Sequence, residues 1–238
     1  MLVREDPRDV LVVKAGQKQV NIDELPAGSV VGTSSIRRTA QIALKYPHLV
    51  VKDMRGNIGT RLAKLDADDG QFDAIILAAA GLLRIDLGGR ITQYLDSRDG
   101  GMLYAVGQGA IGIESRSNDP RVQASLELID HTETHLAVAA ERSLLRTLEG
   151  GCSAPLGVET SWIKGDNGKT LLQMKSNVVS TDGKESVEIE LTQEVKTKAE
   201  AESFGVNAAS KLLHKGADKI LNEIKAKKPT TVMDLAEK

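Results

Sequence analysis

Short apolar runs alternate with amphipathic segments along residues 10–90. The runs that predict strands are Val10–Val13, Val30–Thr33, Leu49–Val51 and Phe72–Ala78. Residues 36–46 and 58–65 place apolar side chains at helical spacing, and Ser34 and Ser35 supply hydroxyls that favour a helix N-terminus. Because strands alternate with short helices, this part of the chain predicts an α/β fold with a largely parallel sheet.

The pattern changes in the second half of the chain. The apolar run 110–114 predicts a further strand, and Asp130 and Glu133 stand at capping-box spacing, which predicts a long helix from there to Glu149. Beyond Pro155, alternating strands are predicted at 158–162, 170–179 and 186–192, followed by helices at 199–213 and 217–226. We therefore expect residues 129–238 to form a separate α+β domain.

Composition narrows the classes of function. The 238 residues are 41% hydrophobic and 27% charged, as in an ordinary soluble protein, and the net charge of −2 argues against nucleic acid or an anionic membrane as partner. The longest apolar stretch, Ala74–Leu83, is far shorter than the about twenty residues of a membrane span. No secretory signal pattern is visible and only one cysteine is present, so we expect a cytoplasmic protein.

Arginine is unevenly distributed along the sequence. Residues 1–120 hold ten of the thirteen arginines but only five of the eighteen lysines. The planar guanidinium matches the two oxygens of a carboxylate or phosphate, whereas lysine on a helix surface mainly contributes solubility. Since both halves are nearly neutral, we expect the first half to bind a compact anionic ligand and not a polyanion.

Two segments combine arginines with glycine turns at predicted strand ends. Gly32-Thr-Ser-Ser-Ile-Arg-Arg38 leads from a strand into a helix N-terminus, and Arg55-Gly-Asn-Ile-Gly-Thr-Arg61 repeats the arrangement after the next strand. In a parallel sheet these strand ends lie side by side, so the four arginines would line one crevice, which Arg84 could join. The alternative is a pair of ordinary helix caps with solvated arginines.

Cys152 follows two glycines between the predicted domains. An exposed thiol on a loop suits covalent chemistry, and an inert packed thiol is the alternative. His131, Glu133 and His135 share part of a metal-binding pattern, but the glutamate that directly follows the first histidine in metalloprotease helices is missing. Helix capping explains these residues, and we expect no metal site.

Four motifs occur in a characteristic order. They are Val31-Gly-Thr-Ser-Ser-Ile-Arg-Arg38, Arg55-Gly-Asn-Ile-Gly-Thr-Arg61, Ala105-Val-Gly-Gln-Gly-Ala110 and Glu149-Gly-Gly-Cys152. Together with Arg4-Glu-Asp-Pro-Arg-Asp9 and the segment 73–81, they resemble the porphobilinogen deaminase (hydroxymethylbilane synthase) family. The resemblance extends over essentially the whole chain.

The resemblance implies a transferase of haem and tetrapyrrole biosynthesis. Such an enzyme condenses four porphobilinogen molecules head to tail into hydroxymethylbilane, with loss of ammonia. By this resemblance Cys152 would carry a dipyrromethane cofactor through a thioether. The residues that would bind or flank the acetate and propionate groups of cofactor and substrate are Ser35, Arg37, Arg38, Arg55, Asn57, Arg61 and Arg84.

The sequence also departs from the family pattern. In the family the segment matching Arg4–Asp9 follows about the first third of the enzyme, and the Lys-Asp-Val-Pro motif with the catalytic aspartate does not occur here. The resemblance implies a remnant of the first domain at 1–9 and 104–128, a periplasmic-binding-like α/β domain at 10–103, and a C-terminal α+β domain at 129–238. We expect a monomer that exposes apolar surface at 104–128. We also expect its enzymatic activity to be weak or absent when the chain is alone, and the sequence does not identify a catalytic residue.

Two other functions stay open at this point. A non-catalytic binder of small carboxylates with a periplasmic-binding-like fold would use the same arginines, but replacing Cys152 by Ser would leave its ligand affinity unchanged. A scaffold or regulatory fragment that pairs with a full-length enzyme is the third possibility.

Overall fold

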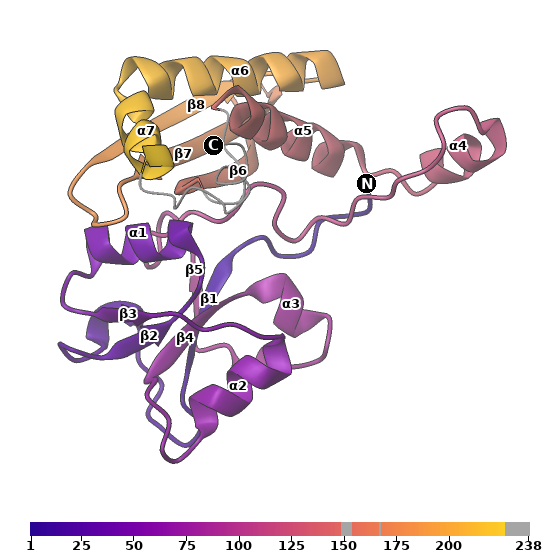
Figure 1. Ribbon diagram of the computed structural model, residues 1–238. Coiled ribbons are helices and arrows are strands. Elements are labelled where there is room, and N and C mark those ends of the chain that lie inside the picture. Colours follow the sequence, from indigo (N-terminus) through magenta and orange to yellow (C-terminus); the bar gives the residue numbers. More distant parts are fainter. Residues whose placement is uncertain (149–153, 167, 227–238) are drawn as a thin grey trace, which may run out of the picture.

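The computed structural model describes residues 1–148, 154–166 and 168–226. Figure 1 shows two sheets, a five-stranded one with helices on both faces and a three-stranded one covered by helices on one side. Helix α1 (Ile36–Lys45) lies between them. The predicted α/β fold class is therefore confirmed, together with a second unit of α+β type.

The first sheet contains the five strands β1 to β5. They are β1 (Asp9–Val13), β2 (Val30–Gly32), β3 (Val50–Lys52), β4 (Ala74–Ala78) and β5 (Gln93–Leu95), in the order β3-β2-β4-β1-β5. β2 runs parallel to β3 and β4, but β1 is antiparallel to both β4 and β5. The expected largely parallel sheet is thus a mixed one. Two consecutive strands can run parallel in one sheet only if a crossover connection, usually a helix, joins them. Between β1 and β2 only the 3₁₀ turn η1 (Ile22–Glu24) is present, so β1 runs in the opposite direction to β2.

Alternate residues of the central strand β1 pack on opposite faces of the sheet. Val10 and Val12 belong to one apolar cluster, which includes side chains of α2 (Ile58–Asp66) and α3 (Ala79–Leu83). Leu11 and Val13 belong to the other cluster, on the side of α1. Because both faces are covered, every residue of this strand is buried, as a continuous apolar run predicts. The short 3₁₀ turn η2 (Gly88–Arg90) precedes β5.

The second unit is an antiparallel sheet packed against helices. Its strands are β6 (Leu156–Lys164), β7 (Thr170–Val179) and β8 (Ser186–Gln193), and its helices are α5 (Thr132–Thr147), α6 (Lys198–His214) and α7 (Ala217–Ala226). Phe204 and Leu212 of α6 pack in a core shared with α5 and the sheet. The three strands and the two helices predicted after Pro155 are confirmed.

Helix α1 connects the two units through a buried glutamine. Gln41 accepts a hydrogen bond from the Leu103 backbone N–H (2.7 Å) and donates one to the Leu103 carbonyl (2.9 Å). Asn177 of β7 donates to the same glutamine at 3.5 Å. Since α1 also carries the predicted anion-binding motif at its N-terminus, these contacts fix that motif relative to the second unit.

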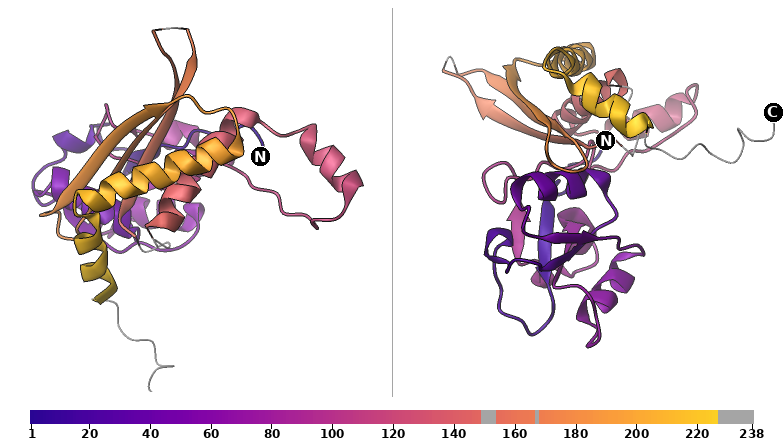
Figure 2. Two further views of the ribbon diagram at one scale, coloured as in Figure 1. Left: turned by 90° about the horizontal axis from the view of Figure 1, so that it is seen from above. Right: turned by 60° about the vertical axis from the view of Figure 1, so that its left-hand side comes forward.

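Residues 110–131 form an arm that extends away from both sheets and carries α4 (Pro120–Glu127) (Figures 1 and 2). The strand predicted at 110–114 is wrong, because no strand in the described chain lies beside this segment to pair with it. Ile111 and Ile113 are 42% and 49% exposed. The apolar surface expected in this region is therefore present.

The capping box predicted at Asp130 and Glu133 is also wrong. Helix α5 begins at Thr132, and the His131 imidazole caps it by accepting from the Thr134 backbone N–H. Asp130 is instead bonded to the N-terminal amine and to His135. The predicted end of this helix, Glu149, lies outside the described residues. Nowhere in the described chain is a helix both long and apolar enough to span a bilayer.

Candidate anion-binding site

The first turn of α1 places two arginines inside the protein. Ser35 is the N-cap, and its hydroxyl accepts a hydrogen bond from the Arg38 backbone N–H at 3.4 Å. Arg37 and Arg38 follow it and are only 5% and 7% exposed. Buried guanidinium groups need compensating acceptors, so the contacts of this pair define what the site can bind.

Asp9, the first residue of β1, lies between the two guanidinium groups. Its Oδ2 atom accepts from Arg37 and its Oδ1 atom accepts from Arg38, each at 2.7 Å. Gln108 donates to Oδ1 as well, at 2.9 Å. Burial by itself would raise the pKa of Asp9, but the two arginines hold that pKa well below its usual range.

Each guanidinium has a second anchor on the backbone. Arg37 donates to the Leu103 carbonyl at 2.6 Å, and Arg38 donates to the Ile76 carbonyl at 2.7 Å. Burial lowers the pKa of Arg37, and the charge of Asp9 opposes that shift. The Nε atom of Arg38 is buried and has no hydrogen-bond partner among the described residues. With one carboxylate for two guanidinium groups, the cluster keeps a net charge of +1.

Beside this cluster is a cavity of about 220 Å³. The residues that line it are Ser35, Arg37, Ala105, Val106, Leu145, Ala154 and Leu156. It therefore lies between the N-terminus of α1 and the α5–β6 part of the second unit. Ala154 is the first described residue after the segment 149–153, and the predicted attachment residue Cys152 lies outside the described residues.

The other predicted residues are placed differently. Arg61 is half-buried, and its Nε donates to the Gly56 carbonyl at 2.7 Å. Burial lowers the pKa of Arg61, and the charge of Arg38 lowers it further. Asn57 is the N-cap of α2 and accepts from the Thr60 backbone N–H at 2.8 Å.

Two predicted arginines lie at the surface. The side chain of Arg55 is 80% exposed and pairs with Asp53 at 3.1 Å. Arg84, at the end of α3, is exposed and donates to the Gly109 carbonyl at 2.8 Å. The structure thus places Ser35 and Arg37 at one cavity, and Arg38 shares Asp9 with Arg37. Arg61 contacts Gly56, Arg55 pairs with Asp53, and Arg84 contacts Gly109.

Sequence reasoning did not single out Asp9 or Gln108. The signal for Asp9 was present, because a carboxylate begins a strand that is otherwise wholly apolar, and acids are almost never fully buried unless paired. Gln108 lies in the motif 105–110 that supports the family resemblance, but its Gly-Gln-Gly segment is equally typical of an ordinary turn, so the pattern did not indicate a contact with Asp9.

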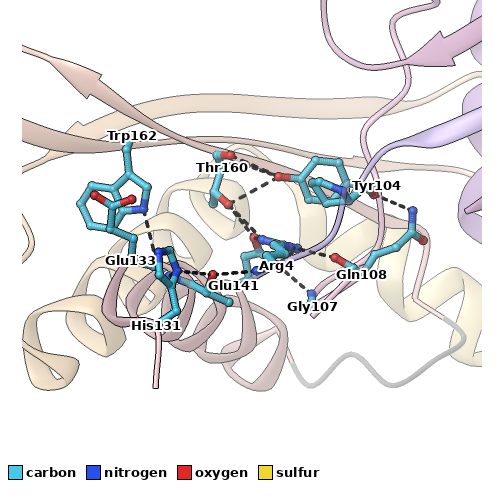
Figure 3. A network of polar contacts seen from close by, with 11 residues as sticks. Arg4, Tyr104, Gly107, Gln108, His131, Glu133, Glu141, Thr160 and Trp162 are labelled. Carbon is cyan, nitrogen blue, oxygen red and sulfur yellow. Dashed lines mark hydrogen bonds and ion pairs between the residues drawn. The ribbon is translucent and has the colours of Figure 1, made fainter. Parts of the chain in front are cut away.

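A second buried ion pair lies next to this region (Figure 3). Arg4 makes a two-pronged contact with the Glu141 carboxylate at 2.6 and 3.0 Å and donates to the Gln108 carbonyl at 2.8 Å. Glu141 also accepts from the Gly107 backbone N–H and from the Thr160 hydroxyl. Every group in this network is bonded within the protein, which indicates a structural junction and not a ligand site.

The two histidines considered as metal ligands have other partners. The Nδ1 atom of His131 lies 2.8 Å from the Thr134 hydroxyl, and that of His135 lies 3.2 Å from Asp130. Across residues 1–148, 154–166 and 168–226, no three His, Cys, Asp or Glu side chains gather as a metal site would require.

Fold and site together define an α/β protein in which Asp9 holds two buried arginines and one of them, Arg37, lines a small cavity. Two family models match the sequence: "Porphobilinogen deaminase, dipyromethane cofactor binding domain" over residues 1–124 and "Porphobilinogen deaminase, C-terminal domain" over residues 135–214. The chain belongs to the porphobilinogen deaminase family.

Curated relatives carry the same family name. The porphobilinogen deaminase of Yarrowia lipolytica is 51% identical over 224 residues, that of Neurospora crassa 51% over 225 residues, and that of Nostoc sp. 47% over 221 residues. These alignments cover 94%, 92% and 93% of this chain, but only 64%, 65% and 65% of the respective relatives. The chain therefore spans a little less than two thirds of the length of these relatives.

Proposed function

We propose that this chain takes part in hydroxymethylbilane synthesis, the stepwise head-to-tail condensation of four porphobilinogen molecules with release of ammonia. The observation that carries the proposal is the buried Arg37–Arg38 pair beside a cavity that reaches Ala154, two residues after Cys152. Family membership and about 50% identity to porphobilinogen deaminases support the same reaction class. A non-catalytic carboxylate binder is not favoured for a member of this family.

The residues of the site fit a dipyrromethane cofactor. Each pyrrole ring of such a group carries two carboxylates, and the site offers guanidinium groups with a net positive charge, a buried Arg38 Nε without a partner among the described residues, and the Ser35 hydroxyl. When attached, the dipyrromethane supplies the pyrrole end to which porphobilinogen units are joined.

Each residue then has a distinct part in the proposed reaction. Cys152 holds the cofactor through a thioether, and Arg37, Arg38 and Arg61 bind acetate and propionate groups. Ser35 and Asn57 fix the helix N-termini next to these groups. Arg55 and Arg84 lie at the surface in this structure, so we assign them to carboxylates farther from the buried pair.

The carboxylate that stabilises positive charge on the pyrrole nitrogen stays unassigned. Asp9 does not suit this part, because both of its oxygens accept hydrogen bonds from guanidinium groups. Residues 10–103 and 129–238 are proposed as the second and C-terminal domains, with 1–9 and 104–128 as the connecting part of the first. A cytoplasmic monomer completes the proposal, and the single cysteine suits that reducing compartment.

Intact mass spectrometry of the purified chain tests the proposal. The chain and its Cys152→Ser variant are compared before and after incubation with porphobilinogen. We expect an added mass equal to dipyrromethane on the unmodified sequence only. Because the chain has no other cysteine, the variant is a complete control for the thioether. A bare mass on both proteins would contradict the proposal for this chain.

A further inference from the structure

Asp9 is a buried residue of the candidate site that has no role in the proposed reaction so far. It is completely buried, it shares its two oxygens between neighbouring arginines, and it lies at the start of strand β1, whereas both arginines belong to helix α1. Two adjacent guanidinium groups repel each other, and burying them without an anion is strongly unfavourable. A carboxylate at this point therefore determines where both groups can lie.

We propose that Asp9 is the positioning residue of the anion site, holding the Arg37 and Arg38 guanidinium planes so that their remaining N–H groups face ligand carboxylates. This inference rests on the proposed function of the site. It assigns to Asp9 no contact with cofactor or substrate.

The geometry supports this assignment in three ways. Each guanidinium is held from two directions, by Asp9 and by the carbonyl of Leu103 or Ile76, so its plane is fixed. Gln108 in turn fixes Asp9, because its amide donates both to Oδ1 and to the Pro7 carbonyl. The donors left over are those of Arg37 at the cavity and the unpartnered Arg38 Nε.

Asp9 has a second effect, which separates positioning from simple charge neutralisation. With Asp9 the cluster has a net charge of +1, and without it the charge is +2. If Asp9 only neutralised charge, removing it would strengthen the attraction of a carboxylate ligand. If Asp9 positions the arginines, removing it weakens binding in spite of the added positive charge. The two interpretations therefore predict opposite signs for Asp9→Asn.

The experiment uses the full chain and two measurements. The first is the side-chain Nε–H signals of Arg37 and Arg38 in NMR spectra of the ligand-free protein. The second is the rate of dipyrromethane loading from porphobilinogen, followed by intact mass. The control is Asp66→Asn, which changes another aspartate bound by two nitrogens of one arginine, Arg90, at 2.8 and 2.9 Å in the same sheet unit.

We expect Asp9→Asn to shift or broaden both arginine signals and to slow loading by about tenfold or more, since both guanidinium groups lose their anionic partner and the single amide oxygen of Asn can accept from only one of the two positions. Asp66→Asn should change neither measurement. Unchanged arginine signals, or loading as fast as in the parent chain, would overturn the inference. If the parent chain itself does not load, the proposed function fails, and the arginine signals alone decide the part of Asp9.

A milder variant covers the case in which Asp9→Asn does not fold. Gln108→Ala removes a neutral support of Asp9 and leaves both ion pairs in place. Because Gln108 shares Oδ1 with Arg38, we expect this variant to shift the Arg38 signal more than the Arg37 signal. Equal shifts of both signals, or none, would count against positioning through Asp9.

Discussion

The carboxylates of Asp9 and Glu141 are both completely buried, and each one is paired with arginine. Arginine suits this environment because it keeps its charge and offers several donors in a fixed plane. Asp9 pairs with the two arginines of the candidate anion site, whereas Glu141 joins distant segments of the chain. The same chemistry thus supports a proposed ligand site in one place and a structural junction in the other.

The low pKa of Asp9 predicts sensitivity to acid. A carboxyl group whose pKa is lower in the folded than in the unfolded protein contributes stability above the unfolded value, which is 3.8 for Asp. That contribution is lost as the pH falls below about 4 toward the folded-state pKa. We expect the free energy of unfolding, measured in urea between pH 6 and pH 3, to fall less steeply in Asp9→Asn than in the parent chain.

The comparison is made with Asp182→Asn as the control. Asp182 has a lowered pKa too, because of hydrogen bonds from Ser180 and Lys184, but it is exposed to solvent, so it contributes little. An equally steep acid dependence in Asp9→Asn and the parent chain would contradict the argument.

At this scale the sequence predicted the two arginines of the candidate site but not the residues that support them. Arg37 and Arg38 were singled out because strand, hydroxyls and arginines are contiguous in the sequence. Asp9 is 28 residues from Arg37 in the chain, and its contact depends on where β1 lies in the sheet. Arg55 and Arg61 belong to one motif but differ in burial and in their partners, which the sequence pattern does not report.

At the scale of elements, helix α1 contacts the second unit in two places: through its own residue Gln41, and through the hairpin turn between β7 and β8. Gly183 of that turn has a φ of +72° and lies directly against the backbone of Ala43, so that a Cβ atom there would overlap it. The turn and the helix come from different units, and their close approach leaves no room for a side chain.

Gly183→Ala therefore tests how firmly the units are held together. We expect it to destabilise the protein by the strain of a left-handed residue, about 1–2 kcal/mol, plus a further term from displacing α1. The control is Gly168→Ala, whose φ is +75° with open space around the Cβ position, so it has the strain alone. Urea unfolding measures both variants, and equal losses of stability would show that the contact with α1 does not matter.

Most elements followed from local patterns, and the failures have a common cause. Strands β1, β2, β3 and β4 have apolar runs, and β6 to β8 alternate regularly, so each was predicted. Strand β5 has only three residues, Gln93–Leu95, and depends on its pairing with β1. The segment 110–114 has the composition of a strand but no neighbouring strand in the described chain. The direction of β1 was also predicted wrongly. In each case the outcome depends on pairing between distant strands, which a local pattern does not report.

At the scale of the whole molecule, Arg4 and Glu141 join four separate parts of the chain. Arg4 lies in the N-terminal segment, Glu141 in α5, Thr160 in β6 and Gly107 in the segment that connects the two units. The Arg4 guanidinium also lies 5.1 Å from the centre of the Tyr104 ring, within cation–π range. Burial raises the pKa of Tyr104 above its ordinary value, as does the nearby charge of Glu141.

Removing the charge of Glu141 should therefore weaken the molecule as a whole. In Glu141→Gln the Arg4 guanidinium keeps its burial but loses its anion, and breaking a buried pair in this way costs about 3–5 kcal/mol. We expect the midpoint of urea unfolding to fall when it is followed by Trp162 fluorescence, which reports on β6. It should also fall when it is followed by far-ultraviolet circular dichroism, which reports on both units.

Glu202→Gln is the matched control, because Glu202 pairs with Arg146 at 3.6 Å at the surface and such pairs contribute less than about 1 kcal/mol. Similar losses in the two variants would mean that the network is not a junction, and a loss seen by fluorescence alone would confine its effect to the second unit.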